Sequence, residues 1–148
     1  MIILLRHGEA GYDAPTDELR ELTERGIRFV RHQATAYAKQ MQQIDKVICS
    51  PYTRTQQTAK LVRDTLPELP FELDARWVPE APLQEAIASL EEHAEQNILV
   101  VTHQPLIGNL IAYLVDGNLQ QPANLMPGEL VVLDTEWPAA GTAIRRPV

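Results

Sequence analysis

Short apolar runs alternate with longer amphipathic segments along the chain, and this alternation constrains the fold more than any other feature of the sequence. The runs MIILLR, KVICS, FELD and NILVVT, at residues 1–6, 46–50, 71–74 and 97–102, have the composition of buried β-strands. Helical patterns fill the stretches between them. Successive strands that are joined through helices pair in parallel, and the helices pack on the sheet. The sequence therefore predicts an α/β fold with a mostly parallel sheet and helices on both of its faces.

The helices are predicted from caps and from apolar spacing. Thr23 can cap a helix that runs to about Gln43 and carries an apolar stripe at helical spacing. This stripe consists of Ile27, Val30, Ala34, Tyr37, Ala38 and Met41. Further helices are expected over residues 52–66 and 82–95. A fourth begins at Pro105, because a residue in the first helical turn does not need its N–H.

The end of the chain predicts two more strands. GELVVLDTE and TAIRR, at residues 128–136 and 142–146, would pair as a closing hairpin, which gives a sheet of about six strands. A loop is expected over residues 11–22, where proline and aspartate interrupt any regular pattern. No internal repeat or linker-like tract marks a second domain, and 148 residues are enough to bury one core. We therefore expect a single domain over residues 1–148.

Net charge and cysteine content narrow the classes of partner and compartment. Asp and Glu outnumber Lys and Arg by 20 to 13, which gives a formal net charge of -7. This sign disfavours binding to nucleic acid or to an anionic membrane surface. Cys49 is the only cysteine of the sequence, which rules out an intrachain disulfide and fits a reducing compartment. The apolar start is too short for a signal peptide or a membrane span, so we expect a cytoplasmic protein.

Arginine and histidine residues follow three of the predicted strands. Arg6 and His7 end the first run, Arg54 lies in the first turn of the helix after the second, and His103 follows NILVVT. The carboxyl ends of parallel strands lie at one edge of a sheet, so these side chains should converge there. Two guanidinium forks match the oxygens of a phosphate, and helix N-termini add N–H donors. The pattern predicts a phosphate site.

An imidazole in such a cluster can act as a nucleophile. Neighbouring cations disfavour a protonated ring, so His7 would keep a lone pair near neutral pH and could form a phosphohistidine intermediate. The arginines would stabilise the transferring phosphoryl group. The four histidines are scattered and show no metal-ligand spacing, so neither a metal nor another cofactor is expected. His32 and His93 are expected to have no role in the chemistry.

Four motifs give the chain a resemblance to the histidine phosphatase superfamily, which also contains phosphoglycerate mutase. LLRHGEA, LTERG, SPYTRTQQTA and VVTHQPLIG occur in the order of the family, at residues 4–10, 22–26, 50–59 and 100–108. The resemblance implies a three-layer α-β-α fold of the phosphoglycerate mutase type, with the first strand beside the strand that ends at His103. It also implies that His7 is the phosphorylated nucleophile and that Arg6, Arg54 and His103 complete the phosphate pocket.

The small size of the chain points to one branch of this resemblance. Larger members carry a helical insertion over the active site, whereas only residues 67–70 separate the second helix from FELD here. The short chain, and the R-x-L-T-x-x-G pattern that starts at Arg20, resemble the SixA-type phosphohistidine phosphatases. Glu21 departs from the proline that is common in that group. The resemblance implies a phosphorylated protein, a histidine phosphotransfer domain, as the substrate; the oligomeric state is not predicted.

Several candidate residues have two readings. Glu80, in WVPEAP, lies where many members of the superfamily place a general acid, but it could equally be a solvated loop acid, and an imidazole leaving group needs less protonation than an alkoxide. Ser50 is expected to cap the following turn and hold the pocket in shape. Gly8 would let the backbone approach phosphate, or is simply a turn glycine. Arg20 is a further candidate for substrate binding.

Other functions remain open from the sequence. A phosphatase of small phosphate esters and a non-catalytic phosphate-binding regulator would both retain this pocket. A mutase would need a cover to keep water from its intermediate. Cys49 and Arg54 are spaced Cys-x4-Arg rather than the Cys-x5-Arg of cysteine phosphatases, and the thiol is expected to be inert core.

Overall fold

A computed structural model describes residues 1–147, and within them six strands form a sheet in the order β3-β2-β4-β1-β5-β6. The strands are β1 (Ile2–Arg6), β2 (Lys46–Cys49), β3 (Phe71–Leu73), β4 (Ile98–Thr102), β5 (Leu130–Asp134) and β6 (Ile144–Arg145). The first four run parallel to one another, whereas β5 pairs antiparallel with both β1 and β6. The predicted mostly parallel sheet, its closing antiparallel pair and the neighbouring positions of β1 and β4 are confirmed.

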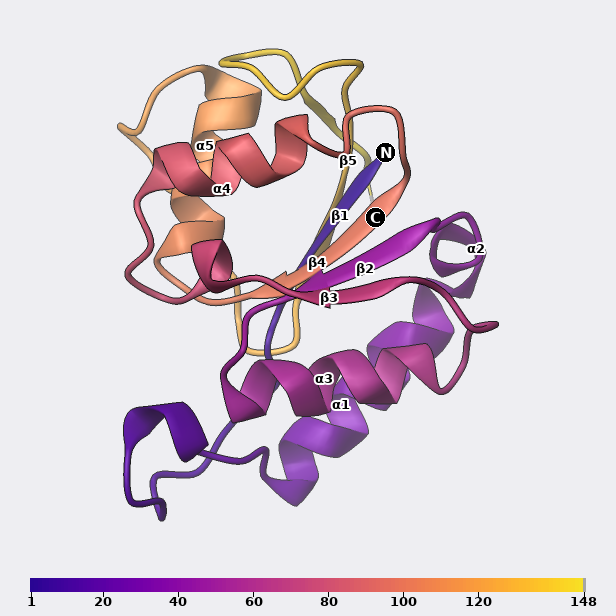
Figure 1. Ribbon diagram of the computed structural model, residues 1–148, viewed down its shortest axis with the longest axis vertical. Helices are drawn as coiled ribbons and strands as arrows, with labels where there is room; N and C mark the ends of the chain where they lie inside the picture. Colours follow the sequence, from indigo (N-terminus) through magenta and orange to yellow (C-terminus); the bar gives the residue numbers. More distant parts are fainter. Residues whose placement is uncertain (148) are drawn as a thin grey trace.

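Helices cover both faces of this sheet (Figure 1). They are α1 (Glu24–Ala36), α2 (Ala38–Met41), α3 (Thr53–Arg63), α4 (Leu83–Glu91) and α5 (Leu106–Asp116), with 3-10 turns η1 (Asp17–Leu19) and η2 (Ala75–Trp77). The first three helices pack on one face, and α4 and α5 pack on the other. The expected three-layer α-β-α arrangement is therefore confirmed.

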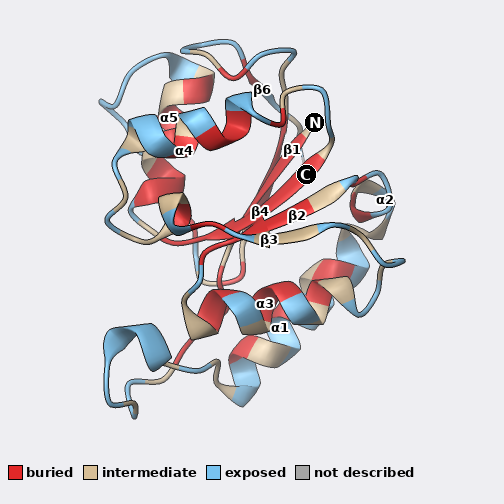
Figure 2. Cartoon of the chain, viewed as in Figure 1, coloured by how far each residue is buried: buried red, intermediate tan, exposed pale blue. Residues whose placement is uncertain are grey.

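The alternation of side chains along β1 explains why a continuous apolar run is needed there. Ile2 and Leu4 point into the core beneath α4 and α5, whereas Ile3 and Leu5 point into the core beneath α1 and α3. A central strand that is covered on both faces has no polar side, as the deep burial of β1, β2 and β4 shows (Figure 2).

The first helix is shorter than the prediction, which extended it from Thr23 to about Gln43. It stops at Ala36 because the backbone of Tyr37 leaves the helical region, with φ of -106° and ψ of 23°, and the short α2 follows. The helices expected over residues 52–66 and 82–95 are also shorter, at Thr53–Arg63 and Leu83–Glu91. After α3, the hydroxyl of Thr65 donates to Val62 O. In a longer helix this carbonyl would accept a backbone N–H four residues further along the chain.

The loop before α1 and the character of the helices complete the description of the fold. The loop expected over residues 11–22 contains η1 and is closed by a bridge between Ala10 and Leu22. Among residues 1–147, no helix combines the length and the apolar character that are needed to cross a membrane.

Candidate active site

The ends of three parallel strands form the floor of the site. Both β1 and β2 pair with β4, so the residues that follow these strands leave the sheet side by side. The His7 N–H donates to Thr102 O at 3.0 Å, and the Ser50 N–H donates to Val101 O at 3.0 Å. His7, Ser50 and His103 therefore emerge at the same edge, as the strand pattern predicted.

The ring of His7 is held as a neutral imidazole by a hydrogen bond at each ring nitrogen. Nδ1 lies 2.7 Å from Gly8 O, and because a carbonyl only accepts, Nδ1 carries the proton. Nε2 is then the acceptor, and Arg54 Nε donates to it at 3.3 Å. Burial, followed by the charges of Arg54 and Arg6, lowers the pKa of His7 to about 4. At neutral pH this nitrogen is unprotonated.

His103 lies beside His7, with 5.1 Å between the ring centroids. Its Nε2 is 2.8 Å from Ser50 Oγ, and the ring of Tyr52 meets it edge-on at 5.0 Å. Burial lowers the pKa of His103 to about 2, and His7 and Arg54 add to the shift. Its Nδ1 is buried and has no hydrogen-bond partner within residues 1–147.

Two buried or half-buried arginines flank the histidines. Arg6 Nη1 donates to Leu125 O at 2.6 Å, and its buried Nε has no partner within the described chain. Arg54 is 4% exposed and donates through Nη1 and Nη2 to the backbone and side-chain oxygens of Asp17, at 2.7 and 3.3 Å. Burial and the charge of Arg54 lower the pKa of Arg6. Two clustered cations of this kind favour a bound anion.

Residues 11–20 form a hook that projects beside the site and contains η1 (Figure 1). Arg20 holds the hook together, since its Nε donates to Gly11 O at 2.9 Å and its Nη1 donates to Asp17 Oδ1 at 3.0 Å. Its donors therefore go to the hook itself, and no hydrogen bond joins Arg20 to His7 in the described structure. Arg20 still contributes to the low pKa of His7 through its charge.

Gly8 and Ser50 have clear structural positions. A Cβ on Gly8 would lie 2.9 Å from Val30 Cγ2, so the close packing of α1 against this turn requires glycine. Ser50 is fully buried, and its hydroxyl contacts His103 and accepts from the Tyr52 N–H at 3.4 Å. The hydroxyl of Ser50 thus lies between the turn after β2 and the ring of His103, and its role in the pocket stays a prediction.

Glu80 lies on the rim of the site. It is exposed, and its carboxylate makes no hydrogen bond or ion pair to any described residue. Burial raises the pKa of Tyr52, and the charge of Glu80 adds to this shift, so the two side chains are within electrostatic reach. The segment that carries Glu80 is anchored to β4, because Thr102 Oγ1 donates to Trp77 O at 2.6 Å.

Two residues of the site were not singled out from the sequence, Asp17 and Thr58. Thr58 Oγ1 accepts from the Gly8 N–H at 3.0 Å and donates to Arg54 O at 2.8 Å. Its spacing of four residues from Arg54 places both on one helix face, which was a usable signal. The contact between Asp17 and Arg54 spans 37 residues, and no local pattern encodes it.

Cys49 is fully buried in β2, and its Sγ lies 3.1 Å from Ser50 O. Burial raises the pKa of this thiol to about 12, so it stays protonated and is not a nucleophile, as the spacing to Arg54 indicated. Across residues 1–147, no three His, Cys, Asp or Glu side chains are grouped as metal ligands.

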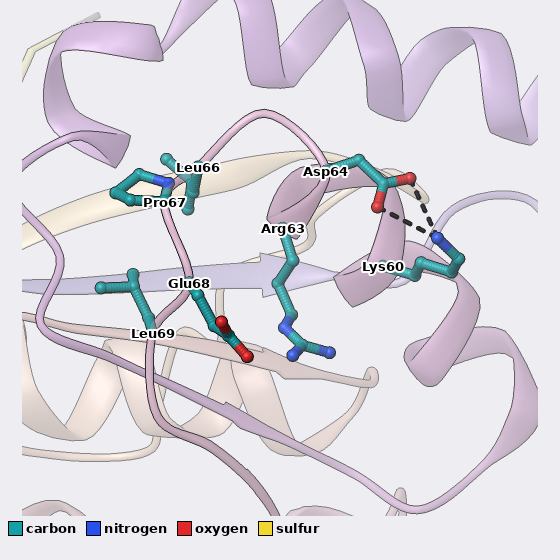
Figure 3. Close-up of a pocket in the computed structure, with 7 residues that line it drawn as sticks. All are labelled: Lys60, Arg63, Asp64, Leu66, Pro67, Glu68 and Leu69. Atoms are coloured by element: carbon teal, nitrogen blue, oxygen red, sulfur yellow. Dashed lines mark hydrogen bonds and ion pairs between the residues drawn. The ribbon is translucent and has the colours of Figure 1, made fainter.

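A cavity of about 450 Å³ lies at the end of α3, away from the histidines (Figure 3). It is lined by Lys60, Arg63, Asp64, Leu66, Pro67, Glu68 and Leu69. The helix α3 starts at the carboxyl ends of the strands, where the site lies, and runs back along the sheet. Its last turn therefore lies near the amino ends of the strands, just before β3. In this cavity Lys60 Nζ donates a hydrogen bond to Asp64 Oδ1 at 3.0 Å. Neither His7 nor His103 lines the cavity.

Three residues of the cluster, Arg6, His7 and Arg54, lie within the match to a family model. The model of the histidine phosphatase superfamily (branch 1) matches residues 2–78, which is more than half of the chain. The chain belongs to this superfamily. The match includes three of the four predicted motifs, and two of these three, LLRHGEA and SPYTRTQQTA, contain Arg6, His7 and Arg54.

Relatives of this superfamily member cover most of its length. It is 32% identical over 123 residues to phosphohistidine phosphatase SixA of Escherichia coli (strain K12), which covers 78% of this chain and 74% of the relative. It is 29% identical over 146 residues to the SixA homolog of Haemophilus influenzae, which covers 89% and 86%. A structure of the protein histidine phosphatase SixA complexed with tungstate matches with a TM-score of 0.87 and 27% identity, over 98% of this chain and 93% of that one. The predicted resemblance is confirmed.

Proposed function

We propose that this protein is a phosphatase that removes the phosphoryl group from phosphohistidine on a protein, through a covalent intermediate on His7. One observation carries the proposal: a neutral His7, its Nδ1 proton held on Gly8 O, presents Nε2 to a pocket of two arginines and a second histidine. A nucleophile, cations for the phosphoryl oxygens and a fixed tautomer are what transfer to histidine requires.

In the first step, His7 Nε2 attacks phosphorus, and the bond between phosphorus and the substrate nitrogen breaks. The bonding electrons stay on the departing ring nitrogen, and the ring leaves as neutral imidazole because its other nitrogen carries a proton, taken from solvent when the phosphohistidine ring is protonated. The phosphoryl group takes the position at Nε2 that the Arg54 Nε–H occupies in the free protein, at 3.3 Å. Arg6 and Arg54 neutralise the phosphoryl oxygens, and the unpartnered Nδ1 of His103 is a further contact for them.

In the second step, water attacks the phosphorus of phospho-His7. The P–N bond breaks, its electrons return to Nε2, and inorganic phosphate leaves with the oxygen of the water. The proton of that water goes to phosphate or solvent, so His7 ends neutral as it began. No step uses a metal or an organic cofactor.

Three observations support a phosphorylated protein as the substrate. The relatives from Escherichia coli and Haemophilus influenzae carry the name phosphohistidine phosphatase. The similar structure holds tungstate, an oxyanion that resembles phosphate. Only a short connection joins α3 to β3, so no helical insertion lies between them to cover the site. We propose a histidine phosphotransfer domain as the physiological partner, acted on by residues 1–148 as one catalytic domain.

The test is a time course of phosphate loss from a phosphohistidine-bearing phosphotransfer protein, in the presence of a chelator. The native chain should release phosphate, whereas His7→Ala should lose at least about a thousandfold of the rate while its circular dichroism is unchanged. Glu80→Gln should keep most of its activity on phosphohistidine, because imidazole leaves readily. The same variant should lose a larger share of its activity on an alkyl phosphate ester, whose alkoxide needs a proton to leave. Rapid turnover by His7→Ala would refute the assignment of His7 as the nucleophile. A native chain that releases no phosphate would refute the proposed function.

A further inference from the structure

We propose that a groove beside the active site, between α1 and residues 126–127, binds an acidic segment with apolar side chains on the substrate protein, next to its phosphohistidine. The groove has a volume of about 410 Å³. It is lined by Glu9, Arg25, Gly26, Arg28, Phe29, Met126 and Pro127, and is called the α1 groove below. The inference rests on the proposed function, since it names where the substrate protein binds around that site.

The α1 groove lies next to the phosphate site, because residues of its walls are close neighbours in the chain of residues at that site. Glu9 of the groove follows His7 by two residues, and the Thr23 N–H donates to Glu9 O at 3.0 Å, which fixes the start of α1 at this edge of the sheet. On the other wall, Met126 follows Leu125, whose carbonyl accepts from Arg6 at 2.6 Å. A protein that presents a phosphoryl group to His7 therefore has this groove beside it.

The backbone around the groove is closely packed. Gly128, at φ of +82°, lies directly under Phe29, and a Cβ there would be 2.6 Å from Phe29 Cδ1. The Gly128 N–H also donates to His7 O at 2.8 Å. A Cβ on Gly26 would lie 2.3 Å from Glu9 O, so α1 is in close contact with this turn. A preformed groove of this kind loses little conformational entropy when a partner binds.

The groove exposes apolar side chains of types that are enriched in protein interfaces. Met126 is 68% exposed and Phe29 is 40% exposed. On the hook, Tyr12 and Leu19 are also exposed, at 83% and 51%. Large apolar groups thus border the edge of the sheet that carries His7, where a partner protein would cover them.

The charge of the groove selects an acidic partner. Arg25, Arg28 and Arg31 are exposed on α1 at intervals of three residues. Arg25 contacts Glu9 only at 3.9 Å, and no ion pair holds Arg28 or Arg31 within the described residues. In a chain of net charge -7, Arg28 and Arg31 are therefore neighbouring cations without an ion-pair partner among the described residues. Carboxylates on the docking segment would pair with them and steer its approach.

The experiment compares two substrates with the same P–N bond, the phosphohistidine-bearing phosphotransfer protein and phosphoimidazole. The variants are Arg28→Glu and Met126→Ser. The control is Arg145→Glu, an exposed arginine of β6 that is in register with Leu133, at the opposite edge of the sheet. For both groove variants, KM for the phosphoprotein should rise about tenfold, with kcat nearly unchanged. Turnover of phosphoimidazole should stay at the native level, and Arg145→Glu should affect neither substrate.

Each alternative result has a distinct meaning. An unchanged KM for the phosphoprotein overturns the docking site, and so does an equal loss on both substrates, because the groove would then only shape the pocket. If sedimentation shows a native dimer that Arg28→Glu dissociates without a change in KM, the occupant is a second copy of this chain and the proposal is wrong. A native chain that is inactive on both substrates overturns the proposed function instead.

Discussion

The charge of single groups at the site depends on their surroundings. Burial and the nearby guanidinium groups of Arg54 and Arg6 lower the pKa of His7 to about 4, whereas a solvated histidine titrates near 6.5. The ring should thus stay neutral through pH 7 to 5, and nucleophilic activity should not fall in that range through protonation of His7. An NMR titration of the ring nitrogens is the direct measurement. A His7 transition near pH 6.5 would contradict the geometry described here.

The same pKa shifts affect stability. The unfolded chain takes up protons on His7 and His103 near pH 6.5, whereas the folded chain resists protonation until about pH 4 and about pH 2. Between these values the unfolded state binds more protons, so stability decreases as the pH falls below about 6.5. The hydrogen bond from Arg20 also lowers the pKa of Asp17 from its ordinary value of 3.8, and the stability that this carboxylate contributes is lost as the pH falls below that value.

Asp17 should compete with a bound anion for Arg54. Its Oδ2 lies 3.3 Å from Arg54 Nη2, and its side chain is 58% exposed, so the pair is weak and easily displaced. Asp17→Asn removes the charge but keeps an oxygen acceptor. Inorganic phosphate should then inhibit about threefold more strongly, because the pocket is more positive. Inhibition constants measure this, and weaker inhibition would show that the carboxylate instead positions Arg54.

At the scale of elements, the start of α1 fixes the turn that carries His7. The Thr23 hydroxyl caps the helix by accepting from the Gly26 N–H at 3.0 Å, and it also donates to Glu9 Oε1 at 2.9 Å. Gly26 then packs directly on the backbone of Glu9. The LTERG motif is therefore explained by the contact between α1 and the loop that carries His7.

This contact predicts the effect of a single methyl group. Gly26→Ala would place a Cβ 2.3 Å from Glu9 O, and we expect a loss of about 1–3 kcal/mol in the free energy of unfolding. The matched control is Gly11→Ala, whose Cβ would meet nothing closer than Thr23 Cγ2 at 4.0 Å. Urea denaturation of both variants compares them. Equal stabilities would show that the turn shifts freely and that α1 does not fix it.

Over the whole molecule, the pocket should couple anion binding to folding. A ligand that binds only the folded chain adds about 2.7 kcal/mol at a concentration of 100 times Kd, or roughly 5–10 °C in Tm for this size. Inorganic phosphate should therefore raise Tm in the native chain and not in Arg54→Ala. Arg63→Ala, in the cavity of Figure 3, should keep the full shift. An equal shift in both variants would place the anion elsewhere.

The order of strands and helices, the parallel sheet and the convergence of His7, Arg54 and His103 could be predicted from the sequence. Local periodicity fixes strands and helices, and parallel strands have their carboxyl ends at one edge. Helix ends were less accurate, because they depend on single contacts such as that of Thr65 with Val62 O. The roles of Glu80, Ser50, Gly8 and Arg20 stay predictions, as does the single domain.

The tertiary structure alone decided how the side chains of the site are paired. The tautomer of His7 depends on Gly8 O, and the partners of Arg54 come from Asp17, 37 residues away. The sequence determined which residues reach the edge of the sheet, since strand periodicity is local. Distances, burial and charge at that edge depend on packing between distant segments, and so do the pKa of His7 and the groove beside it.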